Sequence, residues 1–222
     1  MGKYPHILIT AGPTREMLDP VRFLSNLSTG EMGYELARAA RQRKFRVTLI
    51  SGPATLRPPA NVHFISVVSA KEMKKAVQKC FPKSDALIMT AAVCDYTPVR
   101  RSAHKIKRIS QKSILLKRTD DILKSVAARK GNRMIIGFCL ETEQLEQNAI
   151  RKLREKNLDL IVANYYGSTQ NPFGRNQVSV LLIDKKLRRK RLTQMSKKSL
   201  ARRLIFLVER EVEVKKRRWE NS

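Results

Sequence analysis

Residues 25–33 join a short apolar strand to the start of a helix through small side chains and a glycine. The segment reads Ser-Asn-Leu-Ser-Thr-Gly-Glu-Met-Gly and follows the strand-like run 7–10 and the turn 11–15. In such a loop, main-chain N–H groups and the positive end of the helix dipole face an anion. Small residues such as Ser28 and Gly30 let a ligand approach the main chain closely. The segment therefore predicts phosphate chemistry, although its spacing differs from the G-x-G-x-x-G pattern of dinucleotide-binding enzymes.

Two further candidates, Arg22 and Asn26, lie in the long segment between that strand and that helix. Links in α/β units usually have about 2–6 residues, so a longer link points to a function. Arg22 can bind a carboxylate or a phosphate through two parallel hydrogen bonds, and Asn26 can donate an amide N–H to a developing oxyanion. The alternative is that Arg15 and Asp19 form an ion pair that only shapes the loop.

Asp95 follows the fourth apolar strand, and Lys105 comes ten residues later. A carboxylate at a strand end can hold a ribose hydroxyl or Mg²⁺, and a lysine on an adjoining loop can neutralise phosphate oxygens. The alternatives are an aspartate that only forms a turn and a lysine in a solvated basic loop. Cys94 has no histidine near it in the sequence, so we interpret it as a small packed residue and not as a nucleophile.

Lys152 and Lys156 lie four positions apart, on one face of a predicted helix. Lysines at this spacing repel each other, so a pair that faces a shared anion is a reasonable interpretation. Two idle surface lysines have the same spacing, and the sequence pattern alone leaves both alternatives open.

Apolar strand-like segments alternate with helical patterns along the whole chain. The expected strands are 7–10, 47–51, 62–67, 86–91, 134–138, 160–163 and 178–183, and the expected helices are 31–43, 70–80, 121–129, 143–156 and 197–211. Expected N-caps are Ser69, with Glu72 completing a capping box, and Thr119 or Asp120. Continuous apolar runs are typical of parallel strands covered on both faces. The alternation predicts a Rossmann-like α/β fold with a doubly wound, mainly parallel sheet and a ligand crevice past the carboxyl ends of its strands.

Two segments interrupt this alternation. Residues 96–116 begin with a basic, non-periodic stretch, and residues 113–117 read as a strand, so we expect a loop or hairpin that flanks the crevice. Residues 165–175 contain two glycines, an asparagine and a proline and predict a second loop.

The composition narrows the class of protein. The chain has 222 residues, of which 42% are hydrophobic. The sequence contains no apolar run near the ~18–20 residues of a membrane helix and no stretch that resembles a signal peptide. Cys80, Cys94 and Cys139 show neither disulfide nor metal spacing. We therefore expect a reducing, cytoplasmic environment and no zinc site.

Basic residues give the chain a formal net charge of +27. Residues 185–222 alone contain 15 Lys and Arg against 4 Asp and Glu. Nucleic-acid-binding proteins usually place aromatic side chains among their basic residues, but only Phe206 and Trp219 are aromatic after Phe173. We therefore interpret the charge as a solvated basic face and do not expect nucleic acid as a partner. The expected organisation is a single domain over residues 1–210 and a basic, frayed tail over residues 211–222.

Taken together, the strand ends, loops and helix starts described above resemble those of the phosphopantothenate–cysteine ligases, the phosphopantothenoylcysteine synthetases of coenzyme A biosynthesis. Several of the matching stretches are weak alone, but in register they are highly specific. They match the bacterial, CTP-dependent branch, usually the C-terminal half of a bifunctional protein whose N-terminal half is a flavin-dependent decarboxylase. The sequence lacks that half, so we expect a free-standing synthetase or an excised domain. The matching stretches, in the family's order, are 9–16, 19–26, 28–33, 47–53, 91–96, 105–107, 137–142 and 156–164.

This resemblance implies a ligase reaction in two steps. The carboxylate of 4'-phosphopantothenate attacks the α-phosphate of CTP, which gives an acyl-cytidylate and pyrophosphate. The amine of L-cysteine then displaces CMP and forms 4'-phosphopantothenoylcysteine. Both steps develop negative charge on oxygen atoms, so lysines, Mg²⁺, amide donors and helix N-termini would do most of the catalysis.

The resemblance also implies roles for individual residues. Asn26 matches the asparagine that handles the acyl-cytidylate, Lys105 matches the lysine that acts on it, and Arg22 matches an arginine near the acyl substrate. Asp95 is the expected Mg²⁺ ligand, and Ser28 and Gly30 belong to the expected anion-binding loop. The positions that match CTP contacts are Asp95, Lys105, Phe138, Lys152 and Lys156, together with main-chain groups of Met89, Thr90, Ala91, Asp120, Asp121, Ile122 and Leu123.

Partners also follow from the resemblance. The family is dimeric and exchanges a strand-bearing flap near the active site, so residues 96–117 are expected to contact a second copy. A separate flavin-dependent decarboxylase is another expected partner. The sequence departs from the family pattern at Thr90, Cys94, Leu140 and the stretch 118–121.

Two other classes of protein stay open at this point. A Rossmann oxidoreductase that uses a nicotinamide or another nucleotide would need an acidic residue after the second strand, where this chain has Ser51-Gly52-Pro53. A basic nucleic-acid-binding protein would lose affinity steeply with salt and would not depend on CTP.

Overall fold

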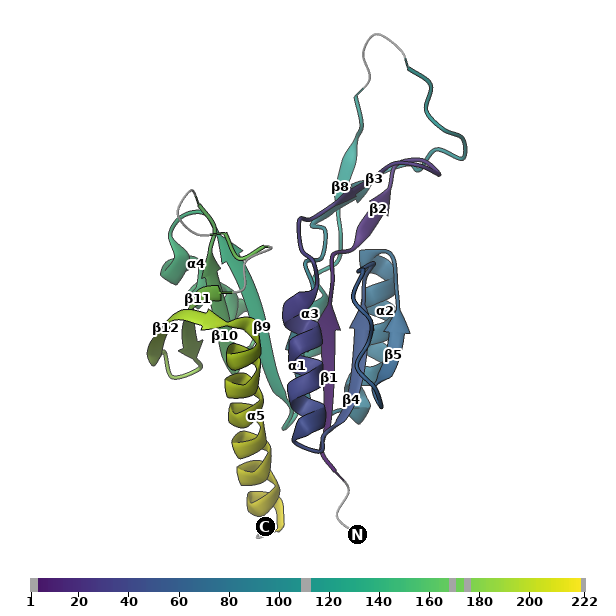
Figure 1. Ribbon diagram of the computed structural model, residues 1–222. Helices are drawn as coiled ribbons and strands as arrows, with labels where there is room; N and C mark the ends of the chain where they lie inside the picture. Colours follow the sequence, from purple (N-terminus) through teal and green to yellow (C-terminus); the bar gives the residue numbers. More distant parts are fainter. Residues whose placement is uncertain (1–3, 109–112, 168–170, 174–176, 221–222) are drawn as a thin grey trace.

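The computed structural model describes residues 4–108, 113–167, 171–173 and 177–220 of the chain. Within this part, one sheet has the strand order β12-β11-β10-β9-β6-β1-β4-β5 (Figure 1). Its strands are β1 (His6–Ala11), β4 (Arg46–Ser51), β5 (His63–Ser66), β6 (Ala86–Met89), β9 (Met134–Glu141), β10 (Leu160–Tyr165), β11 (Gln177–Asp184) and β12 (Arg189–Ser196). Strands β5 to β10 in this order are parallel, whereas β11 is antiparallel to β10 and β12 is antiparallel to β11. The predicted fold class, a mainly parallel α/β sheet, is confirmed.

Helices cover both faces of this sheet. They are α1 (Glu31–Gln42), α2 (Ala70–Cys80), α3 (Ile122–Ala127), α4 (Leu145–Glu155) and α5 (Lys197–Glu220), and a short 3-10 turn, η1 (Phe81–Lys83), follows α2. Helices α1 and α5 share one hydrophobic core with the sheet, and α2, α3 and α4 share a second core on the other face. The sheet is therefore doubly wound, as the alternation of the sequence predicted.

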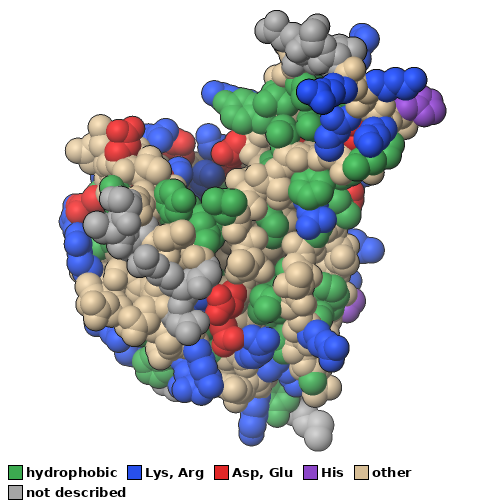
Figure 2. Space-filling view, turned by 45° about the horizontal axis from the view of Figure 1, so that its top comes forward, with side chains coloured by type: hydrophobic (Ala, Val, Ile, Leu, Met, Phe, Trp, Pro, Cys, Tyr) green, Lys and Arg blue, Asp and Glu red, His purple; other side chains and the backbone are tan. Residues whose placement is uncertain are grey.

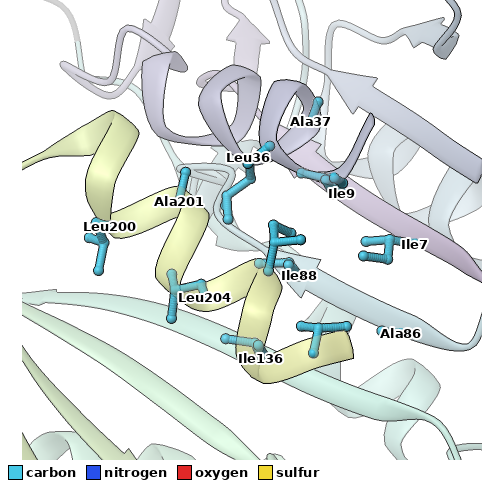
Figure 3. Packing of buried hydrophobic residues seen from close by; sticks show 14 of the residues in the cluster. Ile7, Ile9, Leu36, Ala37, Ala86, Ile88, Ile136, Leu200, Ala201 and Leu204 are labelled. Atoms are coloured by element: carbon cyan, nitrogen blue, oxygen red, sulfur yellow. The ribbon is translucent and has the colours of Figure 1, made fainter. Parts of the chain in front are cut away.

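The first core shows why the apolar runs of the sequence become buried strands. Figure 3 shows Ile7 and Ile9 of β1 beneath Leu36 of α1, with Leu204 of α5 packed on the same face. The strands β1 and β6 are buried along nearly their whole length because helices lie on both sides of them. These two strands form the rigid centre from which the loops of the candidate site extend.

Strands β1 and β6 are neighbours, yet the chain leaves them toward different faces of the sheet. The next helix after β1 is α1, on one face of the sheet, whereas the next helix after β6 is α3, on the opposite face. The strand order places a topological switch point between β1 and β6, and in open α/β sheets ligands bind outside the carboxyl ends of strands at such a point.

Two hairpins protrude beyond this end of the sheet and form the upper part of Figure 1. One consists of β2 (Arg15–Met17) and β3 (Phe23–Ser25), and the other consists of β7 (Tyr96–Pro98) and β8 (Leu116–Arg118). We call these four strands, their turns and the connecting residues 99–108 and 113–115 the flap. The hairpin expected within residues 96–117 is confirmed. The segment around Arg22, which the sequence suggested was a long loop, forms the hairpin β2–β3 instead.

The helix caps follow the predictions only in part. Ser69 caps α2 by accepting a hydrogen bond from the Glu72 main-chain N–H at 3.2 Å, as expected. The prediction for α3 is wrong, because Asp121 is its N-cap and accepts from the Lys124 N–H at 3.0 Å. The two expected residues are engaged elsewhere: the Thr119 hydroxyl donates to the Cys94 carbonyl oxygen, and Asp120 is paired with Lys74. Parts of the loop expected at 165–175 lie outside the described residues.

The basic C-terminal region has two structural roles that the sequence did not reveal. Residues 189–196 form the unpredicted edge strand β12, of which Leu192 is buried and the basic residues 189–191 are exposed. Charged side chains on an edge strand discourage pairing with another chain. Helix α5 then continues to Glu220 without a break at residue 210, so residues 211–220 extend the helix where a separate tail was suggested.

Candidate active site

A sharp turn of the chain brings the N-terminus of α1 to the switch point. Gly30 has a φ of 81° and forms the N-cap of α1 without any hydrogen bond from a side chain. A Cβ atom at this position would lie 3.0 Å from the main chain of Gly12, so only glycine fits without displacement. The Ser28 hydroxyl accepts from the Gly30 N–H at 3.2 Å and stabilises the turn. The predicted anion-binding loop therefore has a defined shape, in which the Glu31 N–H donates to the Thr29 hydroxyl at 3.4 Å.

A cavity of about 180 Å³ opens in front of this helix start. The loop 28–33, the residues after β6, the carboxyl ends of β9 and β10 and the start of α5 form its walls. Five of the residues predicted from the sequence line it together: Ser28, Gly30, Thr90, Ala91 and Phe138. The cavity lies past the carboxyl ends of β6, β9 and β10, at the edge of the sheet where the sequence predicted a crevice.

Thr10, at the end of β1, fixes the wall formed by residues 89–91. The Thr90 hydroxyl donates to the Thr10 carbonyl oxygen at 2.6 Å, and the Ala91 N–H donates to the Thr10 hydroxyl at 3.2 Å. The Thr10 hydroxyl in turn donates to the sulfur of Met89, whose side chain is buried in the core. Among these three predicted residues, Met89 can therefore offer only its main chain to a ligand.

Asn26 lies beside this wall. Its side-chain Nδ2 donates to the carbonyl oxygen of Ala92 at 2.9 Å, and Ala92 lines the cavity. The same nitrogen is 3.9 Å from the sulfur of Cys94. The amide is thus held between a residue of the cavity wall and the buried Cys94.

Arg22 and Lys105 lie together in a different hollow, on the flap. This hollow has a volume of about 730 Å³ and is also lined by Leu18, Ile106, Lys107, Arg108 and Ile114. The structure therefore brings Lys105 together with Arg22, as predicted, but within one copy of the chain neither residue lines the cavity that contains Ser28 and Phe138.

The guanidinium of Arg22 is already occupied by the protein. It donates to the Asp19 carboxylate at 2.6 and 2.9 Å and to the Ile106 carbonyl oxygen at 2.5 Å. Asp19 also accepts from the main-chain N–H groups of Val21, Arg22 and Ile106. These hydrogen bonds hold the pKa of Asp19 far below its ordinary value, against the opposing effect of desolvation by burial, which is the largest single influence. Asp19 is therefore a clamp between the β2–β3 turn and the segment next to Lys105.

Lys152 and Lys156 belong to a third group, on the α4 side of the sheet. The Lys152 ammonium lies 2.5 Å from a Glu141 carboxylate oxygen, and that of Lys156 lies 3.1 Å from Asp121. Since successive side chains of a strand point to opposite faces, Phe138 of β9 lines the cavity while Glu141 holds Lys152 on the other side. Each of the two lysines has its own carboxylate partner, and their role as an anion-binding pair stays a prediction.

The remaining predicted residues surround this third group. Asp120 pairs with Lys74 at 2.8 Å, and the side chains of Ile122 and Leu123 are buried in the core of α2, α3 and α4. Only the main chain of Ile122 and Leu123 is left for the contacts that the sequence predicted. Asp95 is exposed at the start of β7, and its carbonyl oxygen accepts from the Thr119 N–H at 2.9 Å.

The two cysteines near the site have the chemistry of packed residues. Burial raises the pKa of the Cys94 thiol, and it raises that of the Cys139 thiol to about 12 despite the nearby ammonium groups of Lys152 and Lys156. Cys94 is buried, and its sulfur donates to the Thr14 carbonyl oxygen at 3.4 Å. Both thiols are thus protonated near neutral pH, which agrees with the interpretation of Cys94 as a small packed residue.

Asp95 is the residue for which the sequence predicted a Mg²⁺ contact. Within the part of the chain that the structure describes, no three or more His, Cys, Asp or Glu side chains come together as a metal site. Mg²⁺ commonly binds one or two carboxylates together with substrate phosphates. The exposed carboxylate of Asp95 can provide one such ligand.

Sequence reasoning missed the pair of Glu31 and Lys197, which both line the cavity and lie 2.5 Å apart. Asp19 was expected to pair with Arg15, but its partner is Arg22. Lys197 is one of 15 Lys and Arg within residues 185–222, so its sequence context did not distinguish it. Its position as the first residue of α5, just before the apolar repeat Leu200, Leu204 and Val208, was the available signal.

Comparison with known proteins assigns the family. Residues 3–211 match the model of the DNA/pantothenate metabolism flavoprotein C-terminal domain. The chain belongs to this family. A curated relative, the coenzyme A biosynthesis bifunctional protein CoaBC of Bacillus subtilis (strain 168), is 47% identical over 194 residues, which are 86% of this chain and 48% of the relative. The chain thus spans about half the length of the curated relatives that it matches.

Two solved structures have the same architecture as this chain. The C-terminal domain of a bifunctional protein CoaBC is 40% identical with a TM-score of 0.80, and the match covers 94% of this chain and 96% of that one. A Cab2 mutant in complex with phosphopantothenate-cysteine has a TM-score of 0.76 over 96% of this chain and 89% of that one. At 17% identity, this second likeness supports the fold alone. Among the residues that the structure describes, no helix of this chain is long and apolar enough to cross a membrane.

Proposed function

We propose that this chain is the synthetase domain of a phosphopantothenate–cysteine ligase that uses CTP in coenzyme A biosynthesis. In this proposal, 4'-phosphopantothenate and CTP form an acyl-cytidylate with release of pyrophosphate, and L-cysteine then displaces CMP. The observation that carries the proposal is the cavity in front of the N-terminus of α1, whose wall at Ala92 accepts a hydrogen bond from the Asn26 amide. Membership of the family supports the same conclusion.

The groups at the cavity, on the flap and on the α4 side of the sheet together have the chemistry that this reaction needs. The N–H groups at the start of α1 suit phosphate oxygens. Asn26 can donate to the carbonyl oxygen on which charge develops when cysteine attacks, and Lys105 can neutralise charge on the phosphoryl group. Lys152 and Lys156 would bind the triphosphate from the α4 side, and Asp95 would hold Mg²⁺, which draws charge from the phosphates when bound. No covalent enzyme intermediate is needed, in agreement with the protonated thiols of Cys94 and Cys139.

The flap supports a proposal about assembly. Figure 2 shows hydrophobic side chains gathered on the flap, with lysines and arginines around them. Leu115 is 79% exposed, and the other exposed apolar residues of the flap include Val21, Phe23, Tyr96, Ile114 and Leu116. Contiguous exposed apolar surface on a soluble protein commonly marks an interface. A homodimer that covers the flap would also explain why Lys105 lies apart from the cavity within one copy.

The other two classes of protein fit the structure less well. At the end of β4, where a nicotinamide-dependent Rossmann enzyme would need an acidic residue, Ser51 is buried and its hydroxyl bonds to the Gly52 carbonyl oxygen. Nucleic-acid binding is not needed to explain the basic residues of β12, because charged side chains on an edge strand discourage pairing with another chain. Cytoplasmic location and a flavin-dependent decarboxylase, fused or separate, follow from the same proposal.

A pyrophosphate-release assay tests this function. The protein is incubated with 4'-phosphopantothenate, L-cysteine and Mg²⁺, and each of the four nucleoside triphosphates is added in turn. We expect pyrophosphate and CMP with CTP, and an acyl-cytidylate detectable by mass spectrometry when cysteine is left out. Absence of pyrophosphate with all four nucleotides would contradict the proposal. Release that does not need 4'-phosphopantothenate would show a different reaction.

A further inference from the structure

Among the described residues that line the cavity, Glu31 and Lys197 are the charged ones. Glu31 is the first residue of α1, and Lys197 is the first residue of α5. The two helices lie side by side on one face of the sheet and begin at the same end of it (Figure 1). The Lys197 ammonium lies 2.5 Å from a carboxylate oxygen of Glu31, although the residues are 166 positions apart in the sequence.

Burial makes this pair unlike the surface ion pairs of the chain. The side chain of Lys197 is only 7% exposed, whereas that of Glu31 is 35% exposed toward the cavity. An ammonium that is removed from water needs a partner, because an unpaired buried charge is costly. The pair therefore fixes the start of α5 against the start of α1, and its geometry is set before any ligand arrives.

The position of Glu31 raises an electrostatic problem for an anion-binding cavity. A carboxylate in the first turn of a helix interacts favourably with the positive end of the helix dipole. An anionic ligand at the same helix end would be repelled by that carboxylate. With Lys197 in place, the charged residues of the lining sum to zero. The Glu31 N–H donates to the Thr29 hydroxyl at 3.4 Å and the Gly33 N–H to the Gly30 carbonyl oxygen at 3.0 Å, so the Met32 N–H is the group of this turn that the described residues leave for the ligand.

We propose that Lys197 is a positioning residue that neutralises Glu31 and thereby allows the α1 end of the cavity to bind an anionic phosphate group. This inference rests on the proposed function for the identity of the ligand, CTP or its pyrophosphate part. Lys197 acts through Glu31 and does not contact the phosphate itself. Direct contact between its ammonium and the phosphate is the alternative that the test separates.

The test is a double-mutant cycle on the affinity for CTP and for inorganic pyrophosphate, measured by calorimetry with Mg²⁺ present. Lys197→Met keeps the buried alkyl chain and removes the charge, so we expect roughly tenfold weaker binding of both ligands. Glu31→Gln removes the repelling carboxylate, so we expect affinity equal to or higher than that of wild type. The double variant carries neither charge, and we expect it to recover affinity to within about threefold of wild type.

A matched control comes from the next residue. Lys198 is exposed on the same turn of α5, so Lys198→Met removes an equal charge without touching the cavity. We expect it to bind both ligands like wild type, and circular dichroism should give all variants the same helix content. If Lys197→Met does not fold, Glu31→Gln decides alone, because weaker binding by that variant would overturn the inference.

The outcomes separate the inference from the proposed function. A double variant that binds as weakly as Lys197→Met would show direct contact and overturn the inference, and so would a Lys197→Met variant with wild-type affinity. Wild-type protein that binds pyrophosphate but neither binds nor turns over CTP would contradict the proposed function, while the pyrophosphate series would still measure the coupling between the two charges. Wild-type protein that binds neither ligand would contradict both.

Discussion

Three lysines around the candidate site each hold a carboxylate from another element: Lys152 with Glu141, Lys156 with Asp121, and Lys197 with Glu31. Such pairs fix long, flexible side chains before a ligand binds and so reduce the entropy that binding would otherwise cost. They also mean that loss of one lysine leaves a carboxylate facing the anion. At the residue scale, the site is therefore organised by charges that compensate each other within the fold.

Asn26 provides the sharpest test at this scale. Its amide donates to the Ala92 carbonyl oxygen at 2.9 Å, and an aspartate could not donate to a ligand oxygen in its place. We expect Asn26→Asp to form the acyl-cytidylate but to transfer it to cysteine about 10²–10³-fold more slowly, the usual effect of losing one oxyanion donor. Mass spectrometry of quenched reactions should show the adduct persisting. Equal clearance in wild type and variant would exclude this role, and Asn61→Asp, at an exposed turn, is the control.

Lys105 can be separated from its basic neighbours in the same way. Lys105, Lys107 and Arg108 line one hollow on the flap. If they only attracted anions nonspecifically, loss of any one of the three would lower activity by a similar factor. We expect Lys105→Gln to lower kcat about 10²-fold and Lys107→Gln or Arg108→Gln to change it less than about threefold, because only a positioned cation stabilises the transition state. Steady-state kinetics at fixed ionic strength measure this. Similar losses in all three variants would indicate electrostatic attraction by the flap as a whole.

At the scale of the elements, the flap depends on one buried carboxylate. Asp19 has no exposed side-chain surface, and it accepts hydrogen bonds from the β2–β3 turn and from Ile106. Its pKa is lowered in the folded protein, so its contribution to stability is complete above the ordinary value of 3.8 and is lost as the pH falls through the lower, folded value. We expect Asp19→Asn to lower Tm at pH 7 and the difference from wild type to shrink below pH 3.8.

The flap itself should respond most strongly to that substitution. Limited proteolysis at pH 7 should cut the Asp19→Asn variant within residues 99–108 faster than wild type, while the sheet stays resistant, because the clamp joins two surface segments and not the core. Asp85→Asn is a suitable comparison, since the Asp85 carboxylate accepts from His6 at the opposite end of β1. A wild-type proteolysis pattern in Asp19→Asn would contradict the clamp.

Local patterns in the sequence were enough to predict the regular elements. Strands β1, β4 and β6 were found because a strand covered on both faces needs an unbroken apolar run, and Ser69 was found because a helix cap is a short-range signal. Strands β2 and β3 have three residues each, which is too short for any period. Strand β12 was hidden because Leu192 is its only buried residue among the described ones. The pair of Lys197 and Glu31 joins residues that only the tertiary fold brings together.

At the scale of the whole molecule, the charge of +27 and the exposed flap must be explained together. High net charge keeps a chain soluble and opposes nonspecific association. An apolar flap on such a chain therefore indicates one specific contact. We expect wild type to be a dimer, and Leu115→Asp, at a side chain that is 79% exposed, to be a folded monomer with at least tenfold lower activity.

Light scattering coupled to size-exclusion chromatography measures the mass of this variant. Val214→Asp places the same charge on an exposed apolar residue of α5, far along the chain from the flap, and should stay dimeric and active. A Leu115→Asp variant that remains a dimer would show that the flap is not the interface, and one that is monomeric with full activity would show that the site is complete within one copy.

Within one copy of the chain, Lys105 lies outside the cavity. A mixing experiment can therefore test which copy of a dimer supplies Lys105 to each active site. If Lys105 acts in the cavity of its partner, a dimer of one Asn26→Asp chain and one Lys105→Gln chain contains one intact site, built from the unaltered residue of each. Random mixing should then restore about a quarter of wild-type activity, because half of the dimers are mixed and half of their sites are intact. If Lys105 acts within its own copy, every site in every dimer has one defect, and the mixture should stay as inactive as its components. The two variants should be mixed after partial denaturation, since a stable interface would otherwise prevent exchange, and a mixture of Asn26→Asp with itself treated identically gives the baseline.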